Sequence, residues 1–168
     1  DGGFQVGALA KAMYLAEDPE AVEVTAKGDD AQVAETAALL ERENVTIFEG
    51  TIRHGNLLAR VDVLKKRGNV VELIEVKSKS FDPADDANSF LLKKGGLRTG
   101  WKPYLRDVAF QTYVLRQAYP ALEVRPFLLL VWGRWRGPAG PLGCHCWVPR
   151  PAASSPCSSS RSGWCGAT

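Results

Sequence analysis

Two acidic residues and a lysine stand in neighbouring apolar runs near the middle of the chain. Asp62 lies inside the alternating run 57–64, and Glu75 and Lys77 end the next such run, which starts at Val70. Side chains two residues apart point to the same face of a strand, so Glu75 and Lys77 share a face. Two carboxylates and an ammonium group on rigid strands suit a hard divalent cation and a water molecule activated for attack.

The polar segment 65–69 separates these two runs and predicts a turn. A hairpin joined there brings the ends of the two rows of side chains together. We therefore expect Asp62, Glu75 and Lys77 to share one small site. The structural alternative is that Asp62 faces solvent, and that Glu75 and Lys77 form an ordinary ion pair, which contributes little to stability.

The segments around this hairpin predict an α/β fold. Helical spacing of apolar residues occurs in three segments, which are 3–15, 31–43 and 104–119. Extended segments outside the hairpin are expected at 21–24, 46–52 and 122–131. Asp29 or Asp30 is the expected N-cap of the second helix. The strands then form a three-stranded antiparallel meander plus a further strand, in a central mixed sheet flanked by helices.

A glutamine lies on the apolar stripe of the helix that follows Pro103. Val108, Gln111 and Leu115 are spaced i, i+3 and i+7, which places the amide on the inward face. A buried amide needs hydrogen-bond partners, and either the core backbone or the acidic site supplies them.

The segment 81–102 has no regular periodicity. A stretch of this length inside a compact domain is usually functional or mobile. It carries a basic cluster of Lys93, Lys94, Arg98 and Lys102. We weigh a substrate-contacting loop equally with a solvated surface loop.

The charge of the chain argues against a globally basic protein. The formal charge is +2 over 168 residues, but four of the 21 Lys and Arg residues and none of the 19 Asp and Glu residues lie after residue 130, so residues 1–130 carry −2. Any nucleic acid would therefore have to meet a local basic patch.

No apolar run approaches the ~20 residues that span a bilayer, and no signal segment opens the chain, so we expect one cytoplasmic domain. Because the chain begins with Asp1, we interpret it as a fragment.

The combination of these features resembles the PD-(D/E)XK nuclease superfamily. Its elements are a strand with Asp62, a strand with Glu75-Val76-Lys77 and a helix with Gln111. The glutamine helix is similar to that of RecB-like exonucleases. The segments FEGTIRHGNLLARVDVL, VELIEVKSKSF and RDVAFQTYVL resemble a group of bacterial RecB-like nuclease domains. The resemblance covers roughly residues 4–131 and implies a restriction-endonuclease-like core in a nuclease domain over residues 1–131.

The resemblance also implies a metal site. Asp62 and Glu75 would hold Mg²⁺ or Mn²⁺ together with the backbone carbonyl of Val76, and Glu49 is a further candidate ligand. An iron–sulfur cluster is not supported in this fragment, whose four cysteines all lie after residue 130, and one is left open for a longer parent protein with upstream cysteine ligands.

Two further residues take roles from the resemblance. Lys77 would orient or deprotonate the attacking water and offset charge on the phosphate. Gln111 would support the site or contact DNA.

The implied activity is metal-dependent hydrolysis of phosphodiester bonds in single- or double-stranded DNA, as an exonuclease of repair, recombination or defence. A helicase or another repair protein is left open as a partner, and no membrane is expected. The alternative is a catalytically inactive nuclease-fold domain that binds nucleic acid or a protein partner. Basic residues would either follow the DNA backbone or remain solvated surface charges, and these are Lys65, Lys66, Arg67, Lys79, Lys93 and Lys94.

Residues 132–168 form a tail of different composition, with no Ile, Lys, Asp or Glu. Cys144-His145-Cys146 suggests zinc, but the cysteine spacings match no paired Cys-x-x-Cys motif. A disulfide framework is not expected beside a domain without cysteines. We interpret the tail as an out-of-frame translation that is disordered and replaces the C-terminal part of the fold.

Overall fold

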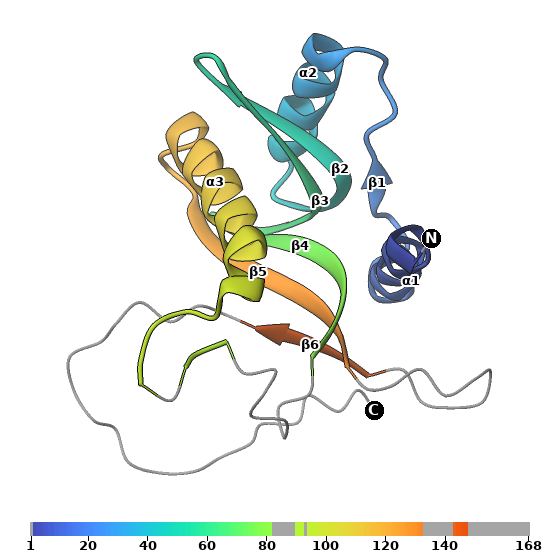
Figure 1. Cartoon of the computed structure of the whole chain (residues 1–168). Coiled ribbons are helices and arrows are strands. Elements are labelled where there is room, and N and C mark those ends of the chain that lie inside the picture. The colour runs from blue at the N-terminus through green and yellow to red at the C-terminus, as the bar shows by residue number, and fades with distance from the viewer. Residues whose placement is uncertain (1, 82–89, 93, 133–142, 148–168) are drawn as a thin grey trace.

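The structure, a computed structural model, describes residues 2–81, 90–92, 94–132 and 143–147 (Figure 1). Among them, no helix combines the length and the apolar character needed to cross a membrane. The elements follow in the order α1 (Gly2–Glu17), β1 (Val22–Glu23), α2 (Asp29–Leu40), β2 (Asn44–His54), β3 (Leu57–Arg67), β4 (Val70–Phe81), the 3-10 helix η2 (Thr99–Trp101), α3 (Lys102–Ala118), β5 (Glu123–Trp132) and β6 (Gly143–Trp147).

The strands form one mixed sheet in the order β1-β2-β3-β4-β5-β6. β2, β3 and β4 are an antiparallel meander, and β5 lies parallel to β4. These strands confirm the predicted α/β fold with a mixed sheet and flanking helices. The sheet is larger than the predicted three strands plus one, because β1 adds a parallel edge beside β2 and β6 adds an antiparallel edge beside β5.

The two added strands carry weak sequence signals. β1 has only two residues. An extended piece was predicted at 21–24, but so short a segment does not indicate which strand it pairs with. β6 lies in the tail, where no hydrophobic period marks a strand. The disorder predicted for the rest of the tail stays a prediction, since residues 133–142 and 148–168 lie outside the described residues.

Both hairpins of the meander turn on the dipeptide Gly-Asn. Gly55 and Gly68 each have a φ of 58°, a left-handed conformation that glycine adopts without strain. A two-residue turn is therefore sufficient, and β3 continues to Arg67 before β4 begins at Val70. The turn predicted at 65–69 has the right place but is shorter, since its first three residues belong to β3.

The start of α2 differs from the prediction. Gly28 is its N-cap, so the expectation that Asp29 or Asp30 caps the helix was wrong. Both aspartates lie in the first turn instead, where carboxylates interact favourably with the positive end of the helix. They also pair with Arg60 and Arg53, which attaches this end of the helix to the sheet.

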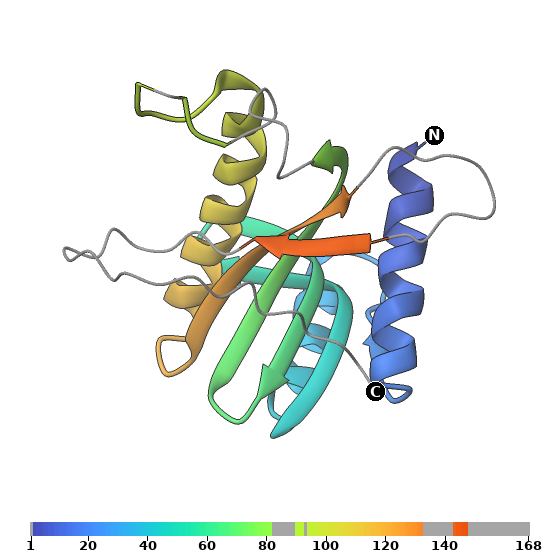
Figure 2. The ribbon, with the colours of Figure 1, turned by 90° about the horizontal axis from the view of Figure 1, so that it is seen from below.

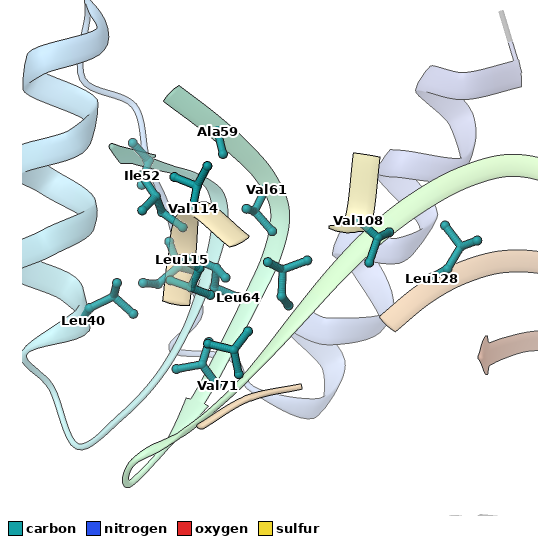
Figure 3. Close-up of a cluster of buried hydrophobic side chains, with 14 of the residues drawn as sticks. Leu40, Ile52, Ala59, Val61, Leu64, Val71, Val108, Val114, Leu115 and Leu128 are labelled. Carbon is teal, nitrogen blue, oxygen red and sulfur yellow. The ribbon is translucent and has the colours of Figure 1, made fainter. Parts of the chain in front are cut away.

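The larger apolar core lies on the sheet face covered by α2 and α3. Leu40 from α2 and Val114 and Leu115 from α3 pack there with Val61 and Leu64 of the sheet (Figure 3). This burial explains why the helices were visible in the sequence, since their apolar residues recur at helical spacing.

A smaller core lies on the opposite face, which α1 covers (Figure 2). Ala10 from α1 packs there against Phe48, Val63 and Ile74 from three strands and Leu129 from a fourth. The middle of the sheet is therefore covered on both faces, by α2 and α3 on one side and by α1 on the other.

Part of the segment before α3 is anchored in the larger core. Phe90 and Trp101 are buried, with ring centroids 4.3 Å apart. The alternative of a wholly solvated surface loop is therefore wrong for the part of the segment that contains Phe90 and Trp101. Residues 82–89 and Lys93 lie outside the described residues, so contact of this segment with a substrate stays a prediction.

Gly50 lies where β2 crosses the larger core, and substituting it is expected to destabilise the fold. A Cβ at Gly50 would stand 2.8 Å from Cδ1 of Leu64, which is fully buried. Overpacking a filled core typically costs about 1–3 kcal/mol. We expect Gly50→Ala to lower the free energy of unfolding by about 1 kcal/mol or more, measured by urea denaturation.

Gly7→Ala is the control for Gly50→Ala. No atom lies within 4 Å of a Cβ at Gly7, and alanine favours the helix. An unchanged unfolding free energy for Gly50→Ala would mean that Leu64 moves aside freely, contrary to the expectation.

Candidate active site

The candidate site lies where β3 and β4 separate. Their ladder ends at the pair Val63 and Ile74, after which β3 continues beside β2 and β4 continues beside β5. Beyond this fork, the backbone N–H of Val76 donates to Oδ2 of Asp62, with a donor–acceptor distance of 2.7 Å. A carboxylate oxygen thus satisfies an amide that would otherwise pair with a strand.

Glu75 is buried on the α3 side of the fork, with 5% of its surface exposed. Nε2 of Gln111 donates to its Oε2 at 2.7 Å and to the carbonyl oxygen of Arg60 at 3.0 Å. The amide therefore connects α3 to both separating strands. This confirms that Gln111 faces inward, and its partners come from both the backbone and the acidic site. Oε1 of Gln111 has no partner among the described residues.

Lys77 stands beside Glu75, as the two-residue spacing predicted. Its Nζ lies 2.6 Å from Oε1 of Glu75 and 3.4 Å from Oδ2 of Asp107. Burial acts to lower the pKa of Lys77, but the two carboxylates outweigh it and raise the pKa above its usual value. Lys77 is therefore a firmly held ammonium group.

Asp62 and Glu49 turn toward α1. Ordinary strands alternate their side chains, yet Phe48 and Glu49 of β2, and Asp62 and Val63 of β3, line one cavity as consecutive pairs. Glu49 has a φ of 55°, the left-handed region that non-glycine residues seldom adopt. This irregular position accounts for the orientation of Glu49, and the register of β2 and β3 skips both Glu49 and Asp62.

The cavity between α1 and the sheet measures about 400 Å³. Its lining residues are Gly7, Ala8, Ala10, Lys11, Phe48, Glu49, Asp62, Val63 and Val76. Glu75, Lys77 and Gln111 approach the fork from the α3 side instead. The structure thus brings Asp62 close enough to interact electrostatically with Glu75 and Lys77 at the fork, while Asp62 also lines the cavity beside α1.

The electrostatic environment of Asp62 is unfavourable to a carboxylate. Burial and the neighbouring charge of Glu75 raise the pKa of Asp62 to about 6, against the smaller opposing effect of the Val76 N–H. Glu49 adds to the rise, and Lys77 opposes it. Crowded carboxylates of this kind favour either a proton or a cation.

The oxygen atoms at the fork have the chemistry of hard-cation ligands. Carboxylate and carbonyl oxygens are the donors that Mg²⁺ and Mn²⁺ prefer. Among the described residues, however, no group of three or more His, Cys, Asp or Glu side chains is arranged to hold a metal ion. The candidate ligands are therefore two carboxylates with a backbone oxygen, and Glu49 as a further acid in the cavity.

Two residues of this region were not predicted from the sequence. Lys11 lies on α1, far from the hairpin in sequence, and nothing in its local pattern relates it to the acids. Asp107 lies four residues before Gln111 on α3, so one helical turn separates them. That spacing was a usable signal for Asp107.

Three of the basic residues considered for DNA binding have partners within the protein. Lys65 pairs with Glu17, Lys66 is buried and donates to the carbonyl of Arg42, and Arg67 pairs with Asp18. They do not form a free basic patch. Of the other basic residues, Lys93 lies outside the described residues and Lys79 lies over the rings of Trp101 and Tyr104.

The raised pKa of Asp62 predicts a pH-dependent loss of stability in metal-free buffer. The folded state holds the proton of Asp62 more tightly than the unfolded chain does. The protonated carboxyl therefore contributes fully to the free energy of unfolding below pH 3.8, and this contribution is lost as the pH rises to about 6. Asp62→Asn removes the charge and keeps an oxygen acceptor. We expect this variant to match the wild type near pH 4 and to exceed it by roughly 2–3 kcal/mol near pH 7.5, measured by denaturation in EDTA.

The control for this experiment is Asp29→Asn, because Asp29 has an exposed side chain that pairs with Arg60. Its difference from the wild type should be small and alike at both pH values. An Asp62→Asn variant no more stable than the wild type near pH 7.5 would contradict the crowding of charge at the fork.

Comparison of the chain with protein-family models, with curated proteins and with solved structures finds no match.

Proposed function

We propose that the chain is a metal-dependent nuclease domain of the PD-(D/E)XK superfamily, of its RecB-like branch, which hydrolyses phosphodiester bonds in DNA. The observation that carries this proposal is the fork between β3 and β4. There an acid from one strand, the Glu-Val-Lys triplet of the next and a helix-borne glutamine are linked by hydrogen bonds.

The acids supply the metal site in this proposal. Asp62, Glu75 and the carbonyl of Val76 would hold Mg²⁺ or Mn²⁺, with Glu49 as an additional ligand from the cavity. When bound, the cation polarises the scissile phosphate and lowers the pKa of a water molecule. The raised pKa of Asp62 supports this role, because carboxylates that repel one another gain most from a cation.

Lys77 orients the attacking water and offsets charge on the phosphate. Glu75 and Asp107 keep its ammonium group charged and in place. A firmly protonated lysine favours orientation and charge stabilisation over removal of a proton from water.

Gln111 positions Glu75 in this scheme. Its amide donates to one carboxylate oxygen of Glu75 and carries no net charge, so it fixes the geometry without competing as a cation. A direct contact of Gln111 with DNA is not needed for this role.

The nuclease proposal predicts cleavage of labelled single- or double-stranded DNA in Mg²⁺ or Mn²⁺, stopped by EDTA. Asp62→Ala removes a ligand and Lys77→Ala removes the positive charge beside the reacting phosphate. Each should lower the cleavage rate by about 100-fold or more. Glu123→Ala, which changes an exposed carboxylate on β5, should cleave like the wild type.

Two outcomes would count against the nuclease proposal. Activity that survives both Asp62→Ala and Lys77→Ala would sink the site assignment. DNA binding that needs no metal and leads to no cleavage would favour the alternative of a non-catalytic nuclease-fold domain.

A separate prediction concerns the positioning role of Gln111. Gln111→Met leaves Oε2 of Glu75 and the carbonyl of Arg60 without their donor. We expect it to raise the Mn²⁺ concentration needed for half-maximal cleavage by about 10- to 100-fold, since outer partners of metal ligands have effects of this size. Gln117→Met is the matched control, an exposed glutamine on the same helix. An unchanged Mn²⁺ requirement in Gln111→Met would show that Glu75 does not depend on this amide.

A further inference from the structure

We propose that Lys11 binds a backbone phosphate of single-stranded DNA, and that the cavity between α1 and the sheet holds one nucleotide beside the fork. The inference rests on the proposed function for the kind of ligand. It goes further by assigning a substrate subsite on α1, a helix on the opposite face of the sheet from α3 (Figure 2).

Lys11 is the basic residue among those that line this cavity. Its Nζ lies 5.8 Å from the ring centroid of Phe48 and 3.9 Å from Oε1 of Glu49. Its side chain is 29% exposed, so part of it is packed against the protein. Lys11 therefore lines the same cavity as Asp62, with its ammonium group near the acid Glu49 of that cavity.

The ammonium group of Lys11 forms an ion pair with Glu23 of β1. Its Nζ lies 2.5 Å from Oε1 of Glu23. Glu23 has a side chain that is 47% exposed, and pairs of this kind contribute about 0–1 kcal/mol. A phosphate can therefore replace Glu23 at small cost. Lysine is a frequent phosphate ligand because its charge is compact and its three donors are free to rotate.

The walls of the cavity fit the rest of a nucleotide. Gly7 and Ala8 are small residues on the accessible part of α1, and Val76 is a partly buried apolar residue on the sheet, while Ala10 and Val63 form the packed floor. A volume of about 400 Å³ falls in the range of small-molecule sites. It suits one nucleotide of an unpaired strand, whereas a paired and stacked base in a duplex is not free to enter.

The choice of a single strand also agrees with the charge of the described residues. Duplex binding draws on an extended row of cations along the phosphates. Lys65, Lys66 and Arg67 already have partners within the protein. One lysine at a narrow cavity is suited to one phosphate.

The experiment compares Lys11→Met, Glu23→Gln and Lys65→Met, all in the Lys77→Ala background so that the DNA stays intact. The probe is a short fluorescein-labelled oligothymidylate in Mg²⁺, and binding is measured by fluorescence anisotropy over a series of salt concentrations. Lys65 is the matched control, since it too joins α1 to the sheet through an ion pair, with Glu17, but does not line the cavity.

We expect Lys11→Met to weaken binding about tenfold and to reduce the slope of log K against log salt by about 0.7, the value for one phosphate contact on a single strand. Glu23→Gln should tighten binding, because it releases Lys11 from its competitor. Lys65→Met should leave the affinity and the slope unchanged. A duplex of the same length should respond little to Lys11→Met.

A merely structural ion pair predicts a different pattern. Lys11→Met and Glu23→Gln would then alter binding in the same direction and leave the salt slope unchanged, which would overturn the inference. No measurable binding of the oligothymidylate would also overturn it.

Cleavage assays separate this inference from the proposed function. If the Lys77-containing chain cleaves single-stranded DNA and Lys11→Met leaves the KM unchanged, the subsite is wrong and the nuclease proposal stands. If binding depends on Lys11 but the chain cleaves nothing in Mg²⁺ or Mn²⁺, the subsite stands and hydrolysis is wrong.

Discussion

The hydrogen bond between the Val76 amide and the Asp62 carboxylate governs the centre of this fold. β3 and β4 separate after Val63 and Ile74, and buried amides on separating strands need new acceptors. A neutral oxygen would satisfy the amide equally well. Use of a carboxylate instead brings a charge next to Glu75 and raises the pKa of Asp62 to about 6. The fold therefore holds a carboxyl group whose charged form is disfavoured, and groups with perturbed pKa values are frequent at functional sites.

The amide of Gln111 is the complement of this bond on the other side of the sheet. It spans the fork by donating to Glu75 on β4 and to the carbonyl of Arg60 on β3. A lysine or arginine in its place would neutralise the acid, whereas the amide orients Glu75 and leaves its charge intact. Lys77 is thus the charged partner of Glu75 at the fork, and Asp107 shares it. The site keeps an excess of negative charge together with a fixed geometry.

The sequence predicted the parts of the site that follow regular periodicity. The two-residue repeat located Glu75 and Lys77, and the helical stripe placed Gln111 on the inward face. The placement of Asp62 and Glu49 in one cavity was beyond such reasoning, because consecutive side chains share a face there and Glu49 adopts a positive φ. Lys11 was missed because its relation to the acids arises only from the packing of α1 on the sheet. The strand β6 was missed because its segment has no apolar period.

The distribution of charge around the fork sets a condition on any anionic ligand. Asp62, Glu75 and Glu49 contribute three carboxylates, while Lys77 and Lys11 stand on opposite sides of the sheet and are each paired to a further acid, Asp107 and Glu23. A phosphodiester approaching this place meets net negative charge from the protein. Opening the Glu23 pair frees one cation, but the acids at the fork still outnumber the lysines. Under the proposed function, a cation at the acids would offset this repulsion, so the charge at the fork agrees with the proposed metal dependence.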